Sequence, residues 1–198
     1  MLRIVIGSAV AALVLFAFGA AFWTCPIPYA YVEKPAVGDR ELGEALRNSL
    51  PNDGLYLIPS PATDHESSRR LHQQGPVVTI HYRKDGASPM SPSVLTQGFF
   101  HGWITTFLLA GLVHLTARPR FGQRLLLVTL AGAAGANYMV LGAGIYWFQP
   151  WPWLILNAAY DSVAFIVCGL VLAAIVKPGG SKPPVDSRPT LEKVPDSR

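Results

Sequence analysis

Residues 154–176 read LILNAAYDSVAFIVCGLVLAAIV and contain one charged side chain, that of Asp161. A helix rises about 1.5 Å per residue, so a stretch of this length reaches across a hydrocarbon core about 30 Å thick. Three other stretches are similarly apolar, and their only charged side chain is that of Arg3, near the start of the chain. The sequence therefore predicts four membrane-spanning helices, at residues 1–23, 98–117, 125–147 and 154–176.

The composition of the whole chain agrees with a membrane protein. Of its 198 residues, 51% are hydrophobic and 14% are charged, whereas about a quarter of the residues of soluble proteins are charged. The first span has two interpretations, because Arg3 followed by an apolar run also suits a cleaved signal peptide. The run continues through Phe22 and Trp23, and such aromatic residues favour the membrane interface. We therefore expect an uncleaved signal anchor.

Basic residues in the short connections set the predicted orientation. Arg118, Arg120 and Arg124 crowd the loop at residues 118–124, while the turn at residues 148–153 contains no Lys or Arg. Short loops rich in Lys and Arg stay in the cytoplasm. Both termini are then cytoplasmic, and residues 24–97 lie outside. We expect a multi-pass protein of the bacterial inner membrane whose basic pI reflects this topology and not binding to nucleic acid.

The two segments outside the spans differ in composition. Residues 177–198 are rich in Pro and charged residues and predict a disordered cytoplasmic tail. Residues 24–97 resemble a small soluble domain, with a helix predicted from Asp39 to Leu50 and Asp39 as its cap. Strands are predicted at residues 55–58 and 77–82, with a polar connection between them that has room for a helical turn.

Together these elements predict the fold class. It is a membrane all-α four-helix bundle with a small α+β extracytoplasmic domain inserted between the first and second helices. About 60 residues with few large apolar groups bury only a small core, so we expect this domain to consist of a helix on two or three strands and to rest on the membrane helices or on a partner.

Histidines raise two metal hypotheses, and neither is favoured. His65, His72 and His81 fall in the outer domain, but none has the i, i+4 spacing of a helical zinc motif. His101 and His114 share one span, where they stand about 140° apart around the helix axis and cannot address the same neighbouring helix as haem ligands. We therefore predict no metal and no cofactor.

Asp161 is the candidate functional residue, because an acidic side chain in a membrane helix costs about 2.5 to 3.5 kcal/mol on insertion scales. Asn137 on the third helix is predicted at the same depth, and Asn157 precedes Asp161 by one helical turn. Thr105 and His101 on the second helix complete this candidate polar layer.

The polar layer has two interpretations. In the first it serves packing, with the Asp161 carboxyl group bonded to Asn137 and to Thr105 or Thr106. In the second it is a proton or solute site, because a carboxyl group in a medium of low dielectric constant can exchange a proton near neutral pH, with His101 as a relay.

Small residues on the third helix predict close approach to a neighbouring helix. Pairs of small residues spaced by four let two helix backbones pack tightly. Such pairs occur at Ala131/Gly135 and Gly132/Ala136, and the adjacent face carries Ala133, Asn137 and Gly144.

Residues 146–153, YWFQPWPW, are the most aromatic part of the chain. Trp and Tyr favour the headgroup level, so this stretch predicts an interfacial belt at the outer surface. Trp23 and Trp103 are expected at the same level. A pocket for a quinone or a lipid is the alternative use of these rings.

Several short motifs occur along the chain: Gly7-Ser8-Ala9 before Phe16 and Trp23, Asp53-Gly54-Leu55-Tyr56-Leu57-Ile58-Pro59, Gly75-Pro76, Met90-Ser91-Pro92, and a Trp- and Pro-rich last hairpin. With these motifs the chain resembles a group of uncharacterised bacterial inner-membrane proteins, over nearly its whole length up to Val176. The resemblance implies the architecture and no activity.

Two classes of function follow. The first is a non-enzymatic accessory or scaffold protein that lies in the lipid bilayer and binds another membrane or periplasmic protein, or a second copy of itself. The second is an oligomeric small-solute or proton-linked transporter that uses Asp161, since four helices alone enclose little pathway. A membrane enzyme ranks third, because no pair of nucleophile and base is recognisable.

Overall fold

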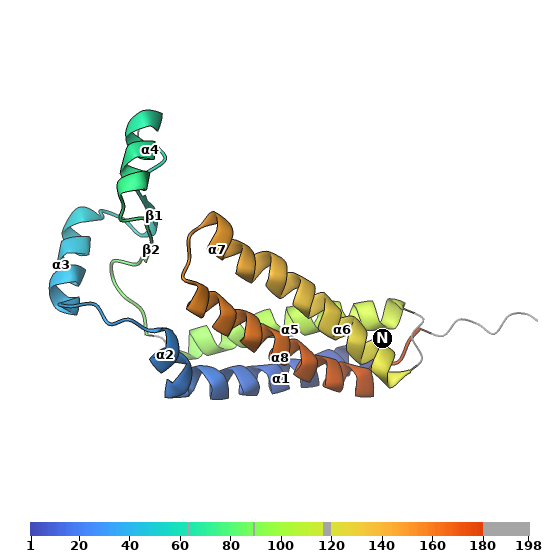
Figure 1. The fold of residues 1–198 in the computed structure, drawn as a ribbon. Helices are drawn as coiled ribbons and strands as arrows, with labels where there is room; N and C mark the ends of the chain where they lie inside the picture. The colour runs from blue at the N-terminus through green and yellow to red at the C-terminus, as the bar shows by residue number, and fades with distance from the viewer. Residues whose placement is uncertain (63, 89, 117–119, 180–198) are drawn as a thin grey trace, which may run out of the picture.

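The computed structural model describes residues 1–62, 64–88, 90–116 and 120–179. It is mostly helical, and its described part contains four helices long and apolar enough to cross a membrane and one two-stranded sheet. Figure 1 shows the long helices running together, with the sheet and the shorter helices gathered beyond one of their ends. The prediction of a mostly helical chain with four candidate spans and a small sheet is confirmed.

Each candidate span exceeds the thickness of a hydrocarbon core. Helix α1 covers Leu2–Thr24, α5 covers Pro92–Leu115 and α8 covers Trp151–Ile175. The remaining span, Phe121–Tyr146, consists of α6 (Phe121–Gly135), a π-helix η1 (Ala136–Leu141) and α7 (Gly142–Tyr146). At about 1.5 Å per residue, each is longer than about 30 Å.

Three spans begin earlier than predicted: α5 starts at Pro92 instead of residue 98, α6 at Phe121 instead of residue 125, and α8 at Trp151 instead of residue 154. Helix α5 begins at Pro92, where the Ser91 Oγ accepts a hydrogen bond from the Val94 N–H at 3.3 Å. Helix α8 begins at Trp151, with a proline in its first positions. Proline suits the first turn of a helix, because the backbone N–H that it lacks would have no partner there. Pro92 and Pro152 therefore lie within the first two positions of their helices, although the sequence prediction began both helices after them.

The long helices pack unequally. Helix α1 packs along both α5 and α8, whereas α6 packs mainly along α8. Figure 1 shows α6 and α7 leaning away from α1 on the far side of α8. The bundle is therefore a group of three helices, α1, α5 and α8, with the fourth span packed mainly against α8 and also touching α5.

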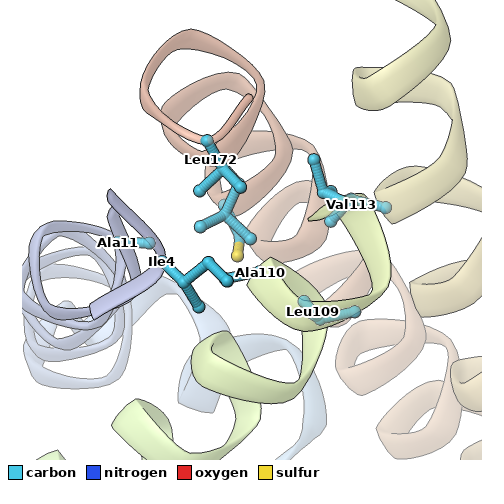
Figure 2. Packing of buried hydrophobic residues seen from close by; sticks show 9 residues of the cluster. Ile4, Ala11, Leu109, Ala110, Val113 and Leu172 are labelled. Carbon is cyan, nitrogen blue, oxygen red and sulfur yellow. The ribbon is translucent and has the colours of Figure 1, made fainter. Parts of the chain in front are cut away.

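The core lies where α1, α5, α6 and α8 meet. Leu172 of α8 is fully buried, as are Ala110 and Val113 of α5 and Val128 of α6. In Figure 2 the labelled Ile4 of α1, Ala110 of α5 and Leu172 of α8 lie close together, and Leu109 and Val113 lie on another side of α5. Small residues such as Ala110 allow the close approach of the helices, as expected for packing within a bilayer.

Polar contacts tie the helix ends together near the N-terminus of the chain. The Arg124 guanidinium donates two hydrogen bonds to the Ala173 carbonyl oxygen, from Nε at 3.1 Å and from Nη2 at 2.8 Å. The Gly179 N–H donates to the His114 carbonyl oxygen at 2.8 Å. A cationic side chain on the last carbonyl groups of a helix complements its dipole. Arg118 and residues 180–198 of the predicted tail lie outside the described residues.

Among the described residues, the segment between α1 and α5 contains five short elements. Helix α2 covers Pro26–Val32, and α3 covers Asp39–Ser49. Strand β1 (Gly54–Ile58) pairs antiparallel with β2 (Val78–Tyr82), with Leu55 opposite His81. Helix α4 (His65–Gln74) occupies the connection between the strands. The N-cap of α3 is Gly38, at φ +77°, so Asp39 lies in the first turn and is not the cap.

The acidic and histidine-containing cluster at the start of α4 is a helix cap. Asp64 is the N-cap, and its carboxylate accepts hydrogen bonds from the N–H groups of Glu66 at 3.1 Å and Ser67 at 3.0 Å. Hydrogen bonds from Ser67, with that from the Glu66 N–H, lower the pKa of Asp64. Asp64 therefore stabilises α4 above the ordinary pKa of a carboxyl group, and this contribution is lost as the pH falls through the lowered value.

This segment buries almost none of its side chains. Neither α3 nor α4 contains a buried residue, and both strands are exposed or half-buried. Leu50 is the only buried residue among those described from 33 to 88. The sheet is present with two strands, but neither helix buries a side chain against it. One ring contact joins the segment to the last hairpin, between His72 and Phe148, with centroids 5.3 Å apart.

Candidate functional site: a pocket beside Asp161

A pocket of about 490 Å³ opens between α1, α5 and α8, at the end of the helices next to α2. Glycine and alanine residues line much of it, among them Gly19, Gly98, Gly102 and Ala164. A Cβ atom added at Gly102 would meet no atom within 4 Å. The pocket exists because these small side chains leave the space between the three helices unfilled.

Three of the predicted polar residues line this pocket together. They are Asp161 of α8 and Thr105 and His101 of α5. The Thr105 hydroxyl donates a hydrogen bond to the His101 carbonyl oxygen at 3.3 Å, within its own helix. Asp161 is half-buried, and among the described residues it has no hydrogen-bond or ion-pair partner. The pocket therefore presents a carboxyl group that the rest of the described chain leaves unpaired.

Asn157 and Asn137 are not among the residues that line the pocket. The Asn157 amide donates a hydrogen bond to the Trp153 carbonyl oxygen at 2.7 Å, one turn earlier in α8. Asn137 lies in η1 and is exposed. The expected hydrogen bond between Asn137 and Asp161 does not form among the described residues.

The position of Asn137 depends on which of the small-residue faces of α6 packs against α8. Gly132 and Ala136 are buried, and a Cβ atom at Gly132 would overlap the Phe165 side chain of α8. Asn137 is one residue further along, about 100° around the axis, and Ala133 beside it is exposed as well. The face with Gly132 and Ala136 therefore turns toward α8, and the face with Asn137 turns away.

Aromatic rings cluster beside the pocket, near the end of α1 next to α2. Trp23 lies at the centre of this aromatic cluster, with ring centroids 5.2 Å from Tyr160, 6.0 Å from Trp153 and 6.2 Å from Tyr29. Trp23, Tyr29 and Tyr160 also line the pocket. Of the rings predicted for the interfacial belt, Trp23 lines the pocket, whereas none of the aromatic residues at 146–153 does.

Trp103 is not part of this aromatic cluster. The prediction that it lies at the same level as Trp23 is wrong. It lies near the middle of α5, because that helix begins at Pro92 and not at the predicted residue 98. Its Nε1–H donates to the Ser8 Oγ at 3.1 Å, near the opposite end of α1 from Trp23. Trp103 therefore connects two helices at depth instead of marking a surface.

The contact between Ser8 and Trp103 belongs to a polar link that the sequence interpretation missed. The Thr106 hydroxyl donates to the Ser8 carbonyl oxygen at 2.9 Å, and both Ser8 and Thr106 are fully buried. The link fixes the α1–α5 pair and uses Thr106, which had been considered as a partner for Asp161. The available signal was Ser8 itself, a hydroxyl group within an apolar span.

A second, shallower pocket of about 540 Å³ lies in the segment between α1 and α5. Three basic residues and one acidic residue line it: Arg47, Arg83, Lys84 and Asp85. The hydroxyl group of Tyr82, another lining residue, is buried without a hydrogen-bond partner among the described residues. This basic groove lies between α3 and the end of β2.

The described histidines do not assemble a metal centre. His65, His72 and His81 are all exposed. No group of three or more His, Cys, Asp or Glu side chains in the described ranges could hold a metal ion.

The chain was compared with models of protein families, with curated proteins and with solved structures, and none of them matches it.

Proposed function

We propose that this chain is a multi-pass protein of the bacterial inner membrane, with both termini in the cytoplasm, that serves as a non-enzymatic accessory or scaffold. Its partner is another membrane or periplasmic protein. The observation that carries the proposal is the near absence of burial from residue 33 to residue 88, where Leu50 alone is buried among the described residues.

Exposed apolar side chains supply the surface for such a partner. Val37, Leu42, Leu55 and Leu71 expose between 44% and 104% of their surface. Exposed apolar groups gathered on one segment are typical of protein interaction sites. The basic groove formed by Arg47, Arg83 and Lys84 lies on the same segment and favours a partner with acidic groups at the rim of the contact.

Substitution of two exposed leucines tests the scaffold function. Leu42 and Leu55 are 48% and 57% exposed, so Leu42→Asp and Leu55→Asp should spare the fold and place a charge in the interface. We expect a protein that co-purifies stoichiometrically with the full chain in mild detergent to be recovered at least about tenfold less with either variant, as for a central interface residue.

The matched control is Arg40→Ala. This change removes an exposed ion pair with Glu44 at 3.1 Å on the same helix as Leu42, and such pairs contribute little to stability. Recovery of the partner should remain unchanged. A monodisperse single copy without a stoichiometric partner, or equal recovery with all three variants, would refute the scaffold function.

The pocket supports a second candidate function, an oligomeric small-solute or proton-linked transporter. The supporting observation is that Asp161, Thr105 and His101 line one cavity. Asp161→Asn should preserve the fold and abolish solute uptake or proton flux in proteoliposomes, because the amide cannot exchange the proton. Asn157→Ala is the control, since that amide bonds only to its own helix. Equal flux in the Asp161→Asn variant and the unaltered protein would exclude the transporter.

A further inference from the structure

We infer that the pocket between α1, α5 and α8 binds a lipophilic amine, an organic monocation with one apolar tail. This inference is independent of the scaffold function and requires no transport across the membrane. It rests on three properties of the pocket: an unpaired carboxyl group, walls of aromatic and small apolar side chains, and a lining without lysine or arginine.

The carboxyl group of Asp161 selects the charge of the ligand. It is half-buried between helices of membrane-spanning length, and the described chain gives it no hydrogen bond or ion pair. A charge removed from water is costly unless it is paired. An ammonium group beside Asp161 would supply both the opposite charge and hydrogen-bond donors. Because the Thr105 hydroxyl gives its proton to the His101 carbonyl oxygen, its lone pairs are available to accept a second N–H.

The walls of the pocket suit the rest of such a molecule. Phe16, Phe99 and Phe165 line it from three different helices, and Trp23 and Tyr160 line it as well. A cation near the face of an aromatic ring is stabilised by the ring quadrupole. The small residues and the rings together leave room for a chain of methylene groups. The volume of about 490 Å³ lies within the range of about 300 to 1,000 Å³ of small-molecule sites.

Other lipid-like ligands fit the pocket less well. No Lys or Arg occurs among the described residues that line it. An anionic amphiphile would therefore meet Asp161 without a compensating charge. A zwitterionic phospholipid would place its phosphate group in the same surroundings, again without a lysine or arginine partner. A neutral alcohol can fill the apolar space but gains no ion pair, so a comparison of head groups separates it from the amine.

The direct test compares three probes of equal chain length on the full protein in lipid nanodiscs. Decylamine is protonated at pH 7, as a lysine side chain is, decanol is neutral and decanoate is anionic. We expect saturable, equimolar binding of radiolabelled decylamine above that of empty nanodiscs. Decanol should bind about tenfold to hundredfold more weakly, as expected when a charged hydrogen bond is lost. Equal binding of decanol or of decanoate would overturn the inference.

Two variants and a matched control locate the binding site. Asp161→Asn removes the charge, and Gly102→Leu fills the pocket from a position where a Cβ atom meets nothing within 4 Å. Each should weaken decylamine binding by about tenfold or more. Gly111→Leu is the control: it lies on the same helix, has equally open surroundings and does not line the pocket. Its affinity should stay within about twofold.

The variants also separate this inference from the other proposals. Undiminished decylamine binding in Asp161→Asn, or equal losses in Gly102→Leu and Gly111→Leu, would reject the amine site. In the scaffold proposal, recovery of a protein partner depends on Leu42 and Leu55, which do not line the pocket. Loss of amine binding with full partner recovery, or the reverse, therefore identifies which of the two proposals fails.

Discussion

Leu172→Ala is expected to lower the free energy of unfolding of the helical bundle by about 2 to 4 kcal/mol. Leu172 is fully buried in the cluster where α1, α5, α6 and α8 meet. Lipid tails are as apolar as leucine, so the loss comes from van der Waals contacts and from the cavity left behind, and not from exposure to water. Unfolding in mixed micelles with increasing SDS, followed by circular dichroism, measures the change.

Leu170→Ala is the matched control for Leu172→Ala. Leu170 lies on the same helix, two residues earlier, and is 45% exposed. Because nearly half of its surface is exposed, its truncation should change the free energy of unfolding by no more than about 0.5 kcal/mol. Equal losses for the two variants would show that α8 does not present Leu172 to the core.

Gly132→Ala is expected to destabilise the bundle by about 1 to 3 kcal/mol, although alanine is the better helix former. The added methyl group would overlap the Phe165 side chain, which packs directly over Gly132. Helices α6 and α8 would then have to move apart along the contact that holds α6 in the bundle. The same unfolding assay measures this loss.

Gly135→Ala on the same helix is expected to have the opposite effect on stability. A Cβ atom there meets nothing within 4 Å, so this substitution should stabilise by up to about 1 kcal/mol through helix propensity alone. The double variant Gly132→Ala with Phe165→Leu should recover part of the loss, because the smaller side chain makes room. Stabilisation by Gly132→Ala would contradict the close packing of α6 against α8.

The spans were predictable because length and hydropathy determine them almost without tertiary information. A stretch with Asp161 as its only charge has few alternatives to a long buried or membrane helix. The starts of α5 and α8 were less accessible to prediction. Pro92 and Pro152 fit either a turn before a helix or its first turn, and Ser91, which caps α5, decides between the two.

The candidate site was predictable in part, for a similar reason. Asp161, Thr105 and His101 could be assigned to neighbouring helices at comparable depth, and the structure brings all three to one pocket. The direction in which Asn137 faces could not be predicted, because α6 offers two adjacent small-residue faces that could pack against α8. Only the fit of Gly132 against Phe165 selects one of them, and that is a property of two helices together.

The π-helix η1 also determines how the third span meets α8 at two separate points. Gly132 packs under Phe165, and a Cβ atom at Gly144 would come within 2.6 Å of the Leu154 side chain. In a regular α-helix the twelve-residue step between these glycines would leave them about 120° apart around the axis. Because a π-helix has wider turns, each of its residues rotates the chain through a smaller angle about the axis. The π-helix η1 lies between the two glycines. The angular phase of the span is thereby reset, so that one helix can present glycine to the same neighbour twice.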